Sequence, residues 1–547
     1  MKNINGLTLK QMIISGANNL YNHYPEIDAL NVFPVPDGDT GTNMNLTITS
    51  GSKEVQNRND TDVYEIAKAF SKGLLMGARG NSGVILSQIF RGFAQSLEGK
   101  KVIKPTDLAE AFYNGKEVAY KAVMRPVEGT ILTVIREAST ALMEKVNDNM
   151  SIEKCFEILL NEARESLDRT PELLPVLKEV GVVDSGGAGL IKVLEGFQLS
   201  IQGKIVERQL ATAVDEKSPL SMAGANVEGD EFGYCTEFIM QLGPENVKKP
   251  FVEKRFTNVL ASHGNSLVVV RDDDIVKVHV HTMMPGSILT YAQQYGEFKT
   301  IKVENMTEQH TKLEEEKKLQ QEDTPLKDYA LIAVAVGDGV EDMFKELRVD
   351  VIVSGGQTMN PSTEDFIAAI KKCHAKNIFI MPNNSNIIMA ASQACDVCKD
   401  ENINAIVIPS KTIPQGFAAC MNFNPEASVE ENRVNMEEAL PSIKTGLVTF
   451  AIKDTSIDGV QVKKDQFIGI VNKSIVCSLD DKLEATEKLV ESMIDDMTSI
   501  ITLIAGEDVT ETELEELLDR IQEKNEDVDI DVRRGNQPVY SFIIGVE

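Results

Sequence analysis

The chain has 547 residues, of which 42% are hydrophobic and 25% are charged, a composition typical of soluble globular proteins. At about 150 residues per domain, this length predicts three or four domains rather than one. The 84 acidic side chains outnumber the 55 basic ones and give a formal net charge of −29. This charge argues against a nucleic-acid partner, because phosphate backbones are bound by basic surfaces.

The sequence offers no membrane segment and no secretion signal. No apolar run reaches the about 18 residues that span a bilayer, and the first residues lack the apolar core of a signal peptide. The seven cysteines are scattered, without the spacing of a disulfide framework. Cys395 and Cys398 lie in an Ala-rich helical segment with no second pair, which favours a structural role over a redox or zinc motif. We therefore expect a cytoplasmic protein without a membrane span.

Residues 1–207 form the first expected domain, and nearly all of it shows helical periodicity. Leu9, Met12 and Ile13, for example, follow the i, i+3, i+4 spacing of a buried helix face. The same pattern recurs over 43–57, 62–76, 82–97, 106–123, 131–147, 152–167 and 186–202. Breaks that contain Gly or Pro separate these segments. We expect an all-α domain whose loops carry the unusual sequence.

The first of these loops reads Asn31-Val-Phe-Pro-Val-Pro-Asp37-Gly-Asp39-Thr-Gly-Thr-Asn43-Met44. Asp37 and Asp39 are one residue apart on a turn just before a helix. Carboxylates in this arrangement suit one or two hard divalent cations, and the free N–H groups from Thr40 to Asn43 suit an anion. A Mg-nucleotide needs both. The alternative is an ordinary surface turn, since Asp and Gly favour turns for local reasons.

Three further loops lead into helix N-termini in the same way. They are Gly77–Gln88, which contains Asn81 and Ser82, then Arg125–Thr133, and Gly181–Gly189 with its Asp184. Each helix N-terminus carries roughly half a positive charge, so several at one point would make an anion site. The alternatives are a Gly-rich turn between helices at Gly77–Gln88 and a simple N-cap role for Asp184.

An expected linker at 208–231 and a charged linker at 305–327 enclose a small α+β domain at 232–304. Within it, His279 and His281 lie on one face of an expected strand, since side chains alternate with period two. Cys235 lies in a second strand-like stretch that could neighbour the first. A Cys/His/His set suits Zn²⁺. The alternative is a pair of histidines on the polar face of an edge strand.

From 328 to 547, short apolar runs alternate with helical patterns, which is typical of an α/β domain with a parallel sheet. The runs are Ala330–Val336, Val349–Val353, Ile378–Met381 and Ala405–Ile408. Ser362 is the expected N-cap of the helix after the second run, with Asp365 at the capping-box spacing.

The four N-terminal loops together resemble a known family. Asn31–Met44, Gly80–Ser87, Glu128–Thr133 and Asp184–Gly189 are similar to the nucleotide-binding subunit of dihydroxyacetone kinases. The whole chain is more similar to the ATP-binding catalytic subunit of the bacterial two-component fatty acid kinase. This resemblance implies a helical barrel that binds ATP at one end with two Mg²⁺ ions. The region 328–547 resembles the fatty-acid-binding partner subunits of the same kinase.

The family's functional residues transfer to the matching positions of this sequence. Asp37 and Asp39 would hold Mg²⁺. Dihydroxyacetone kinases have a third aspartate five residues before the first of this pair; this chain has Val32 there, and the adjacent Asn31 is the candidate for the missing oxygen. The expected phosphate contacts are Thr40, Gly41, Thr42, Asn43, Asn81 and Ser82. The expected lining of the nucleotide pocket is Thr130, Ile131, Leu132, Asp184 and Gly186. Related proteins carry Cys235, His279 and His281 at a zinc site, so the resemblance favours zinc.

The resemblance implies ATP-dependent phosphorylation of a fatty acid carboxylate, presented by a separate fatty-acid-binding protein, to give an acyl phosphate. A carboxylate is already ionised near neutral pH and needs no strong base, which fits the absence of an obvious base near Asp37. The alternatives are a dihydroxyacetone-type hydroxyketone kinase and a nucleotide-sensing scaffold without turnover. Because 328–547 lacks a clear carboxylate site, we expect it to serve dimerisation or docking, in a homodimer.

Overall fold

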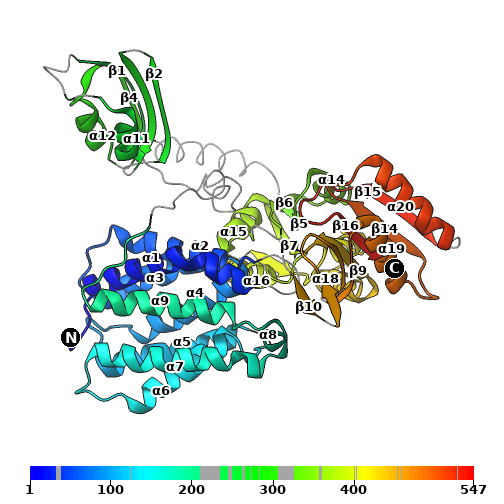
Figure 1. Ribbon diagram of the computed structural model, residues 1–547, viewed down its shortest axis with the longest axis horizontal. Helices are drawn as coiled ribbons and strands as arrows, with labels where there is room; N and C mark the ends of the chain where they lie inside the picture. The colour runs from blue at the N-terminus through cyan, green and yellow to red at the C-terminus, as the bar shows by residue number, and fades with distance from the viewer. Residues whose placement is uncertain are drawn as a thin grey trace. The chain divides into compact units, whose positions relative to one another are not determined.

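The computed structural model describes residues 1–31, 38–123, 125–209, 234–243, 249, 251–261, 265–272, 274–282, 284–305, 326–356, 360–399, 401, 403–451, 454–457, 459–472, 474–525 and 528–547. The chain divides into two compact units (Figure 1). The first unit joins Met1–Asp215 to Lys327–Glu547, and the second is Glu216–Leu326. Within the first unit, we call α1 to α9 the helical part and β5 to β16 the C-terminal part.

The helical part matches the all-α domain expected from the periodicity. Its elements are α1 (Gly6–Leu30), α2 (Thr40–Gln56), α3 (Val63–Met76), α4 (Gly80–Ser96), α5 (Pro105–Ala122), α6 (Ile131–Lys145), α7 (Ile152–Leu173), α8 (Pro175–Val180) and α9 (Ser185–Ile201). Side chains just before several helices accept a backbone N–H of the first turn, as Asp62 does from Tyr64 and Ser151 from Lys154. Such caps fix where a helix begins.

The helices pack in sequence order around one core, and α9 returns against α1 to close the ring. Close approach of these two helices depends on glycine. A Cβ on Gly196 would lie 2.6 Å from the Cα of Gly16, so neither position has room for a side chain. Buried phenylalanine rings from α4, α5, α7 and α9 follow one another through the core, with centroids 5.1–6.4 Å apart, at Phe93, Phe112, Phe156 and Phe197. This closed packing is the helical barrel that the resemblance implies.

The second unit is the expected small α+β fold. It contains β1 (Tyr234–Leu242), α11 (Glu253–Ala261), β2 (Asn265–Asp272), β3 (Ile275–Thr282), α12 (Pro285–Ala292) and β4 (Gly296–Asn305). The strands form an antiparallel sheet in the order β2-β3-β1-β4. Phe238 and Phe256 lie in its core together with Val276 and Val278. The boundaries expected for this domain and for its two linkers stay predictions.

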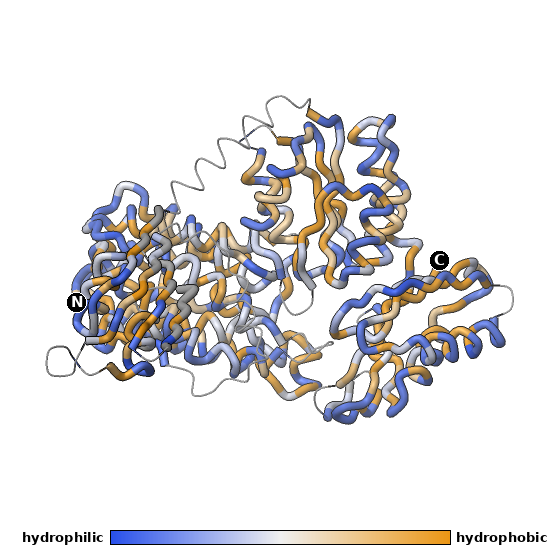
Figure 2. The backbone as a smooth tube through the Cα atoms, turned by 90° about the horizontal axis from the view of Figure 1, so that it is seen from above, coloured by the Kyte–Doolittle hydropathy of each residue, from blue (hydrophilic) through white to orange (hydrophobic). Residues whose placement is uncertain are grey.

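The first half of the C-terminal part is the parallel α/β sheet that the alternating pattern predicts. Its elements are β5 (Lys327–Ala335), α14 (Asp338–Glu346), β6 (Val351–Ser354), α15 (Thr363–Lys372), β7 (Ala375–Met381), α16 (Ile388–Lys399), β8 (Asn404–Val407), α17 (Ile413–Met421), α18 (Val429–Glu438) and a short 3₁₀ helix (Leu440–Ser442). The strand order is β6-β5-β7-β8, and every pair is parallel. Figure 2 shows hydrophobic residues along these strands and hydrophilic ones on the surrounding helices.

The second half of the C-terminal part is a separate mixed sheet, which the sequence patterns did not predict. Its elements are β9 (Lys444–Phe450), β10 (Thr455–Ile457), β11 (Val460–Val462), β12 (Phe467–Val471), β13 (Ser474–Leu479), α19 (Lys482–Met493), β14 (Ile500–Ala505), α20 (Glu511–Lys524), β15 (Asp529–Arg534) and β16 (Phe542–Val546). Six strands follow the order β13-β12-β9-β16-β14-β15, in which only β14 and β15 pair in parallel.

The helical and C-terminal parts are joined by hydrogen bonds as well as by packing. The backbone N–H of Thr363 donates to the carbonyl of Ala78 at 3.2 Å, and Arg79 forms a backbone bridge with Ser362. Gln88 on α4 donates to Gln393 on α16 at 3.1 Å, in a buried position. The turn between α3 and α4 therefore lies directly against the start of α15.

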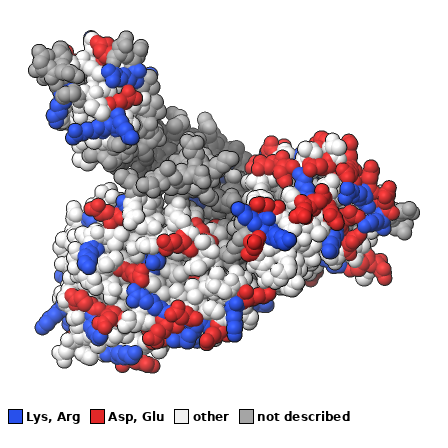
Figure 3. Space-filling model, viewed as in Figure 1, with Lys and Arg blue, Asp and Glu red and all other residues white. Residues whose placement is uncertain are grey.

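Two surface properties bear on partners. Among the described residues, no helix combines the length and the apolar composition needed to cross a membrane. The face shown in Figure 3 carries Asp and Glu over both parts of the first unit, with a dense group over the C-terminal part. No basic face of the kind that binds nucleic acid is visible in this view.

Candidate functional site

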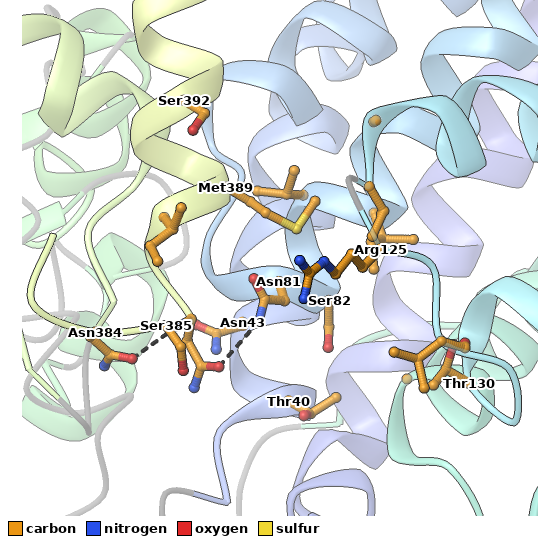
Figure 4. A pocket seen from close by; sticks show the side chains of 18 of the residues that line it. Thr40, Asn43, Asn81, Ser82, Arg125, Thr130, Asn384, Ser385, Met389 and Ser392 are labelled. Carbon is orange, nitrogen blue, oxygen red and sulfur yellow. Dashed lines mark hydrogen bonds between the residues drawn. The ribbon is translucent and has the colours of Figure 1, made fainter. Parts of the chain in front are cut away.

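The N-terminal ends of α2, α4, α6 and α9 open into one cavity of about 1580 Å³ in the first unit. Figure 4 shows Thr40, Ser82 and Thr130 around it, each from a different helix end. The facing wall comes from the C-terminal part, with Asn384 and Met389 among its residues. The four loops singled out in the sequence therefore meet at one place.

The cavity is lined by most of the residues expected to bind nucleotide. These are Asn31, Asp39, Thr40, Asn43, Asn81, Ser82, Thr130, Ile131, Leu132, Asp184 and Gly186. Gly41 and Thr42 are not among the lining residues, and Asp37 lies outside the described residues.

Asp39 stands at the N-cap position of α2 and is 7% exposed, but its side chain does not cap its own helix. Its Oδ2 accepts a hydrogen bond of 2.7 Å from the amide of Asn360, which belongs to the C-terminal part. Asn31 lies next to the same helix end, where its Nδ2 donates to the hydroxyl of Thr40 at 2.9 Å. Carboxylate, amide and hydroxyl oxygens are thus gathered at the start of α2, and oxygen donors are the ligands that Mg²⁺ prefers.

Asp28 was missed by the sequence reasoning, and it explains why Thr42 is absent from the cavity lining. Its carboxylate accepts from the backbone N–H of Thr42 at 3.0 Å and from the Thr42 hydroxyl at 2.7 Å. Burial raises the pKa of Asp28 to about 6, although hydrogen bonds from Thr42 and Gly41 oppose the shift. One carboxylate from α1 therefore occupies N–H groups that were expected to face phosphate. No sequence motif identifies Asp28, because it lies near the end of a long helix.

Glycine is required at the start of α4. Gly80 has φ +57°, and a Cβ there would lie 2.6 Å from the side-chain amide of Asn43. The absent side chain lets the ends of α2 and α4 approach each other beside the cavity. Asn81 follows directly and donates to Asn386 of the C-terminal part at 3.2 Å. The Gly-rich loop is therefore more than a turn between helices, since it also contacts the facing wall.

The starts of α6 and α9 share one carboxylate. Thr130 caps α6 by accepting from the N–H of Leu132, and Asp184 caps α9 by accepting from Gly187 at 2.7 Å. A second backbone hydrogen bond, from Ile131, ties Asp184 to the start of α6. Burial nevertheless raises the pKa of Asp184 to about 6. The N-cap alternative for Asp184 is correct, and Asp184 also lines the cavity.

Positive side chains of the cavity were not singled out in the sequence. Arg91, Lys121, Arg125 and Lys411 all contribute to the lining. Figure 4 shows Arg125 extending toward Asn81 and Ser82. These groups come from three separate segments of an acidic chain, and only the fold brings them together. With the helix ends, they give the cavity the electrostatic character of an anion site.

The expected zinc residues belong to the second unit. Backbone pairing places Cys235 of β1 opposite His281 of β3, and His279 is two residues from His281 on the same strand. The side chains of all three lie outside the described residues. Among the side chains that are described, no group of three or more His, Cys, Asp or Glu residues is placed to hold a metal ion.

Comparison with protein families accounts for nearly the whole chain. Residues 34–199 match the DAK2 domain, 231–313 match the middle domain of the FakA-like fatty acid kinase family, and 330–547 match the C-terminal domain of that family. The chain is 47% identical over its full length to Protein YloV of Bacillus subtilis, all of which is covered. It is also 46% identical over its full length to an uncharacterized protein of Staphylococcus epidermidis, with 99% of that protein covered.

The chain belongs to the FakA-like fatty acid kinase family. The fold class and the resemblance drawn from the four loops are confirmed by this membership, and the family is one of kinases. Among solved structures, the Fak B3 protein of Streptococcus pneumoniae loaded with linoleic acid is 14% identical, covers 40% of this chain and 99% of its own, and has a TM-score of 0.27. A likeness of that size establishes neither fold nor function.

The buried Asp184 yields a test of the site's electrostatics. Its folded-state pKa, about 6, lies above the ordinary 3.8. The ionised carboxylate therefore costs stability above pH 6, and the cost disappears as the pH falls toward 4. Asp184→Asn keeps an acceptor for the cap without the charge. The melting temperature of the variant minus that of the unmodified chain should be larger at about pH 7.5 than at about pH 4.5. Calorimetry of both proteins, without nucleotide or metal, measures this difference; an equal difference at both pH values would contradict the assignment.

Proposed function

We propose that the protein is an ATP-dependent kinase that phosphorylates the carboxylate of a fatty acid presented by a separate lipid-binding protein, giving an acyl phosphate. The observation that carries the proposal is the convergence of four helix N-termini and Asp39 on one cavity. Helix ends offer N–H groups and positive potential to phosphates. Family membership supports ATP as the phosphoryl donor.

The residues at the start of α2 fit a Mg²⁺ complex. Asp39 would hold the cation together with Asp37, and Asn31 is the candidate for a further oxygen. Bound Mg²⁺ neutralises charge on the β- and γ-phosphoryl groups during transfer. Asn43 and Ser82, at the starts of α2 and α4, would orient the phosphates. Arg125 adds a positive charge beside them.

The choice of acceptor rests on membership of the FakA-like fatty acid kinase family. Among the described residues, the cavity lining holds the carboxylates of Asp39 and Asp184 but no histidine. Phosphorylation of a hydroxyl group needs a base to accept its proton, whereas a carboxylate is ionised at neutral pH. In the proposed step, a carboxylate oxygen bonds to the γ-phosphorus and the bond to the bridging oxygen of ATP breaks. The products are acyl phosphate and ADP, and no proton has to be removed from the acceptor.

Two other functions make different demands. A dihydroxyacetone-type kinase would phosphorylate the small ketone without any lipid-binding partner. A nucleotide-sensing scaffold would bind ATP without turnover. The acidic ligand at Asp39 favours catalysis over sensing, because a scaffold does not need metal-binding carboxylates.

The proposal also includes a cytoplasmic location, where the six described cysteines, all buried and unpaired, stay reduced. The homodimer stays a prediction.

We further propose a zinc site in the second unit, at Cys235, His279 and His281. Its support is the backbone register, because directly paired residues of adjacent strands share a face of the sheet, as do residues two apart. The expected result is about one zinc per chain by elemental analysis after chelator-free purification. The variant His279→Ala with His281→Ala should lose it. Equal zinc in both proteins would contradict the assignment.

The kinase proposal is tested by turnover of the full chain with ATP, Mg²⁺ and a partner protein loaded with fatty acid. Acyl phosphate trapped with hydroxylamine should appear only when all components are present. Asp39→Asn should lower kcat by at least about 100-fold, since a metal ligand has been neutralised. Asp342→Asn, which changes a surface aspartate with 69% exposure, is the matched control and should leave turnover unchanged.

The same assay separates the alternatives. Transfer to dihydroxyacetone without the partner would favour the hydroxyketone kinase. ATP binding by calorimetry without transfer to either acceptor would favour the scaffold. Full turnover by Asp39→Asn would contradict the metal assignment.

A further inference from the structure

One side chain of the C-terminal part, Asn360, forms a hydrogen bond with the carboxylate of Asp39. Asn360 is 1% exposed, and its Nδ2 donates to Oδ2 of Asp39 at 2.7 Å. The two residues are 321 positions apart in the chain. The other polar atom of the same amide, Oδ1, is buried and has no hydrogen-bond partner. A buried acceptor without a partner lowers stability, and a ligand that donates to it or is coordinated by it would remove that cost.

The backbone of Asn360 is held in place by a residue of the helical part. The guanidinium of Arg79, in the loop before α4, donates to the backbone carbonyl of Asn360 at 2.8 Å. Arg79 also lies 3.6 Å from the carboxylate of Asp365 on α15. Asp365 in turn completes the capping box with Ser362 that starts this helix. The position of Asn360 therefore depends on the contact between the two parts, to which Arg79 contributes.

We propose that Asn360 is a positioning residue of the kinase site, which the C-terminal part supplies to orient the metal-binding carboxylate of Asp39. This inference rests on the proposed function, in which Asp39 holds the cation. A carboxylate that accepts a hydrogen bond on one oxygen has its rotation fixed. Hydrogen-bonded partners of metal-binding carboxylates typically contribute about 10- to 100-fold in metal affinity or activity. The unpartnered Oδ1 of Asn360 belongs to the same amide and is a hard oxygen of the kind that coordinates Mg²⁺ or accepts a hydrogen bond from a Mg²⁺-bound water.

A consequence for the whole chain follows from linkage. If contact with the C-terminal part raises metal affinity at Asp39, metal binding must strengthen that contact by the same factor. The C-terminal part then takes part in metal binding at the kinase site. The same geometry also defines the opposite possibility, in which the amide of Asn360 competes with the cation for Asp39. The two possibilities predict changes of opposite sign when the amide is removed.

The experiment measures Mn²⁺ binding to the full chain in the presence of a non-hydrolysable ATP analogue, from the electron paramagnetic resonance signal of free Mn²⁺. Asn360→Ala should weaken Mn²⁺ binding by about 10- to 100-fold, and binding of the analogue without metal should stay unchanged. Lys371→Ala, which removes an exposed side chain of α15, is the control and should bind like the unmodified chain.

Arg79→Ala should weaken Mn²⁺ binding in the same direction, because it releases the backbone of Asn360. The double variant should bind no more weakly than Asn360→Ala, since Arg79 acts through Asn360. If Arg79→Ala instead caused a general loss of structure, the double variant would bind Mn²⁺ more weakly than Asn360→Ala. If Asn360→Ala does not fold, Mn²⁺ binding by Arg79→Ala tests the inference instead. Unchanged or tighter Mn²⁺ binding by Asn360→Ala would overturn the inference, whereas absent Mn²⁺ binding by the unmodified chain would overturn the proposed function itself.

Discussion

The backbone N–H groups at the N-terminal ends of four helices have no acceptors within their own helices. The rest of the site depends on which groups accept hydrogen bonds from them. α2, α4, α6 and α9 begin at the same cavity, where their positive ends lie close together. Asp28 accepts hydrogen bonds from the start of α2. Asp184 accepts them from the starts of α9 and α6. Both carboxylates have pKa values raised to about 6 by burial. Positive potential at the cavity comes from the helix ends together with Arg91, Lys121, Arg125 and Lys411, and phosphates are proposed to bind there.

The C-terminal part, which matches the C-terminal domain of the FakA-like family, contributes to the same cavity. It supplies Asn360 to Asp39, Asn386 to Asn81 and Gln393 to Gln88. Each of these bonds joins two polar side chains across the contact, and Ala78 and Val84 of the helical part pack into the apolar core of the parallel sheet beside them.

Much of this architecture could be predicted from the sequence, and the parts that could not share a physical cause. Helical periodicity predicted the all-α domain, and the family resemblance implied its closure into a barrel. The predicted helix starts at 43, 82 and 186 lie one to three residues after the observed starts at Thr40, Gly80 and Ser185. The mixed sheet from β9 to β16 was missed, because its short strands alternate with helices and pair with distant segments. Asp28, Arg125 and Asn360 were missed for a related reason. Their roles come from long-range contacts that local spacing does not record, and the partner of Asp39 lies 321 residues away.

The most direct test of the central claim is a diffraction experiment on crystals grown with Mn²⁺ and a non-hydrolysable ATP analogue. The proposed arrangement predicts anomalous scattering from Mn²⁺ beside the carboxylate of Asp39. It also predicts that the phosphates lie against the starts of α2 and α4, with the base toward Thr130 and Leu132. Mn²⁺ bound away from Asp39, or a nucleotide outside this cavity, would contradict it.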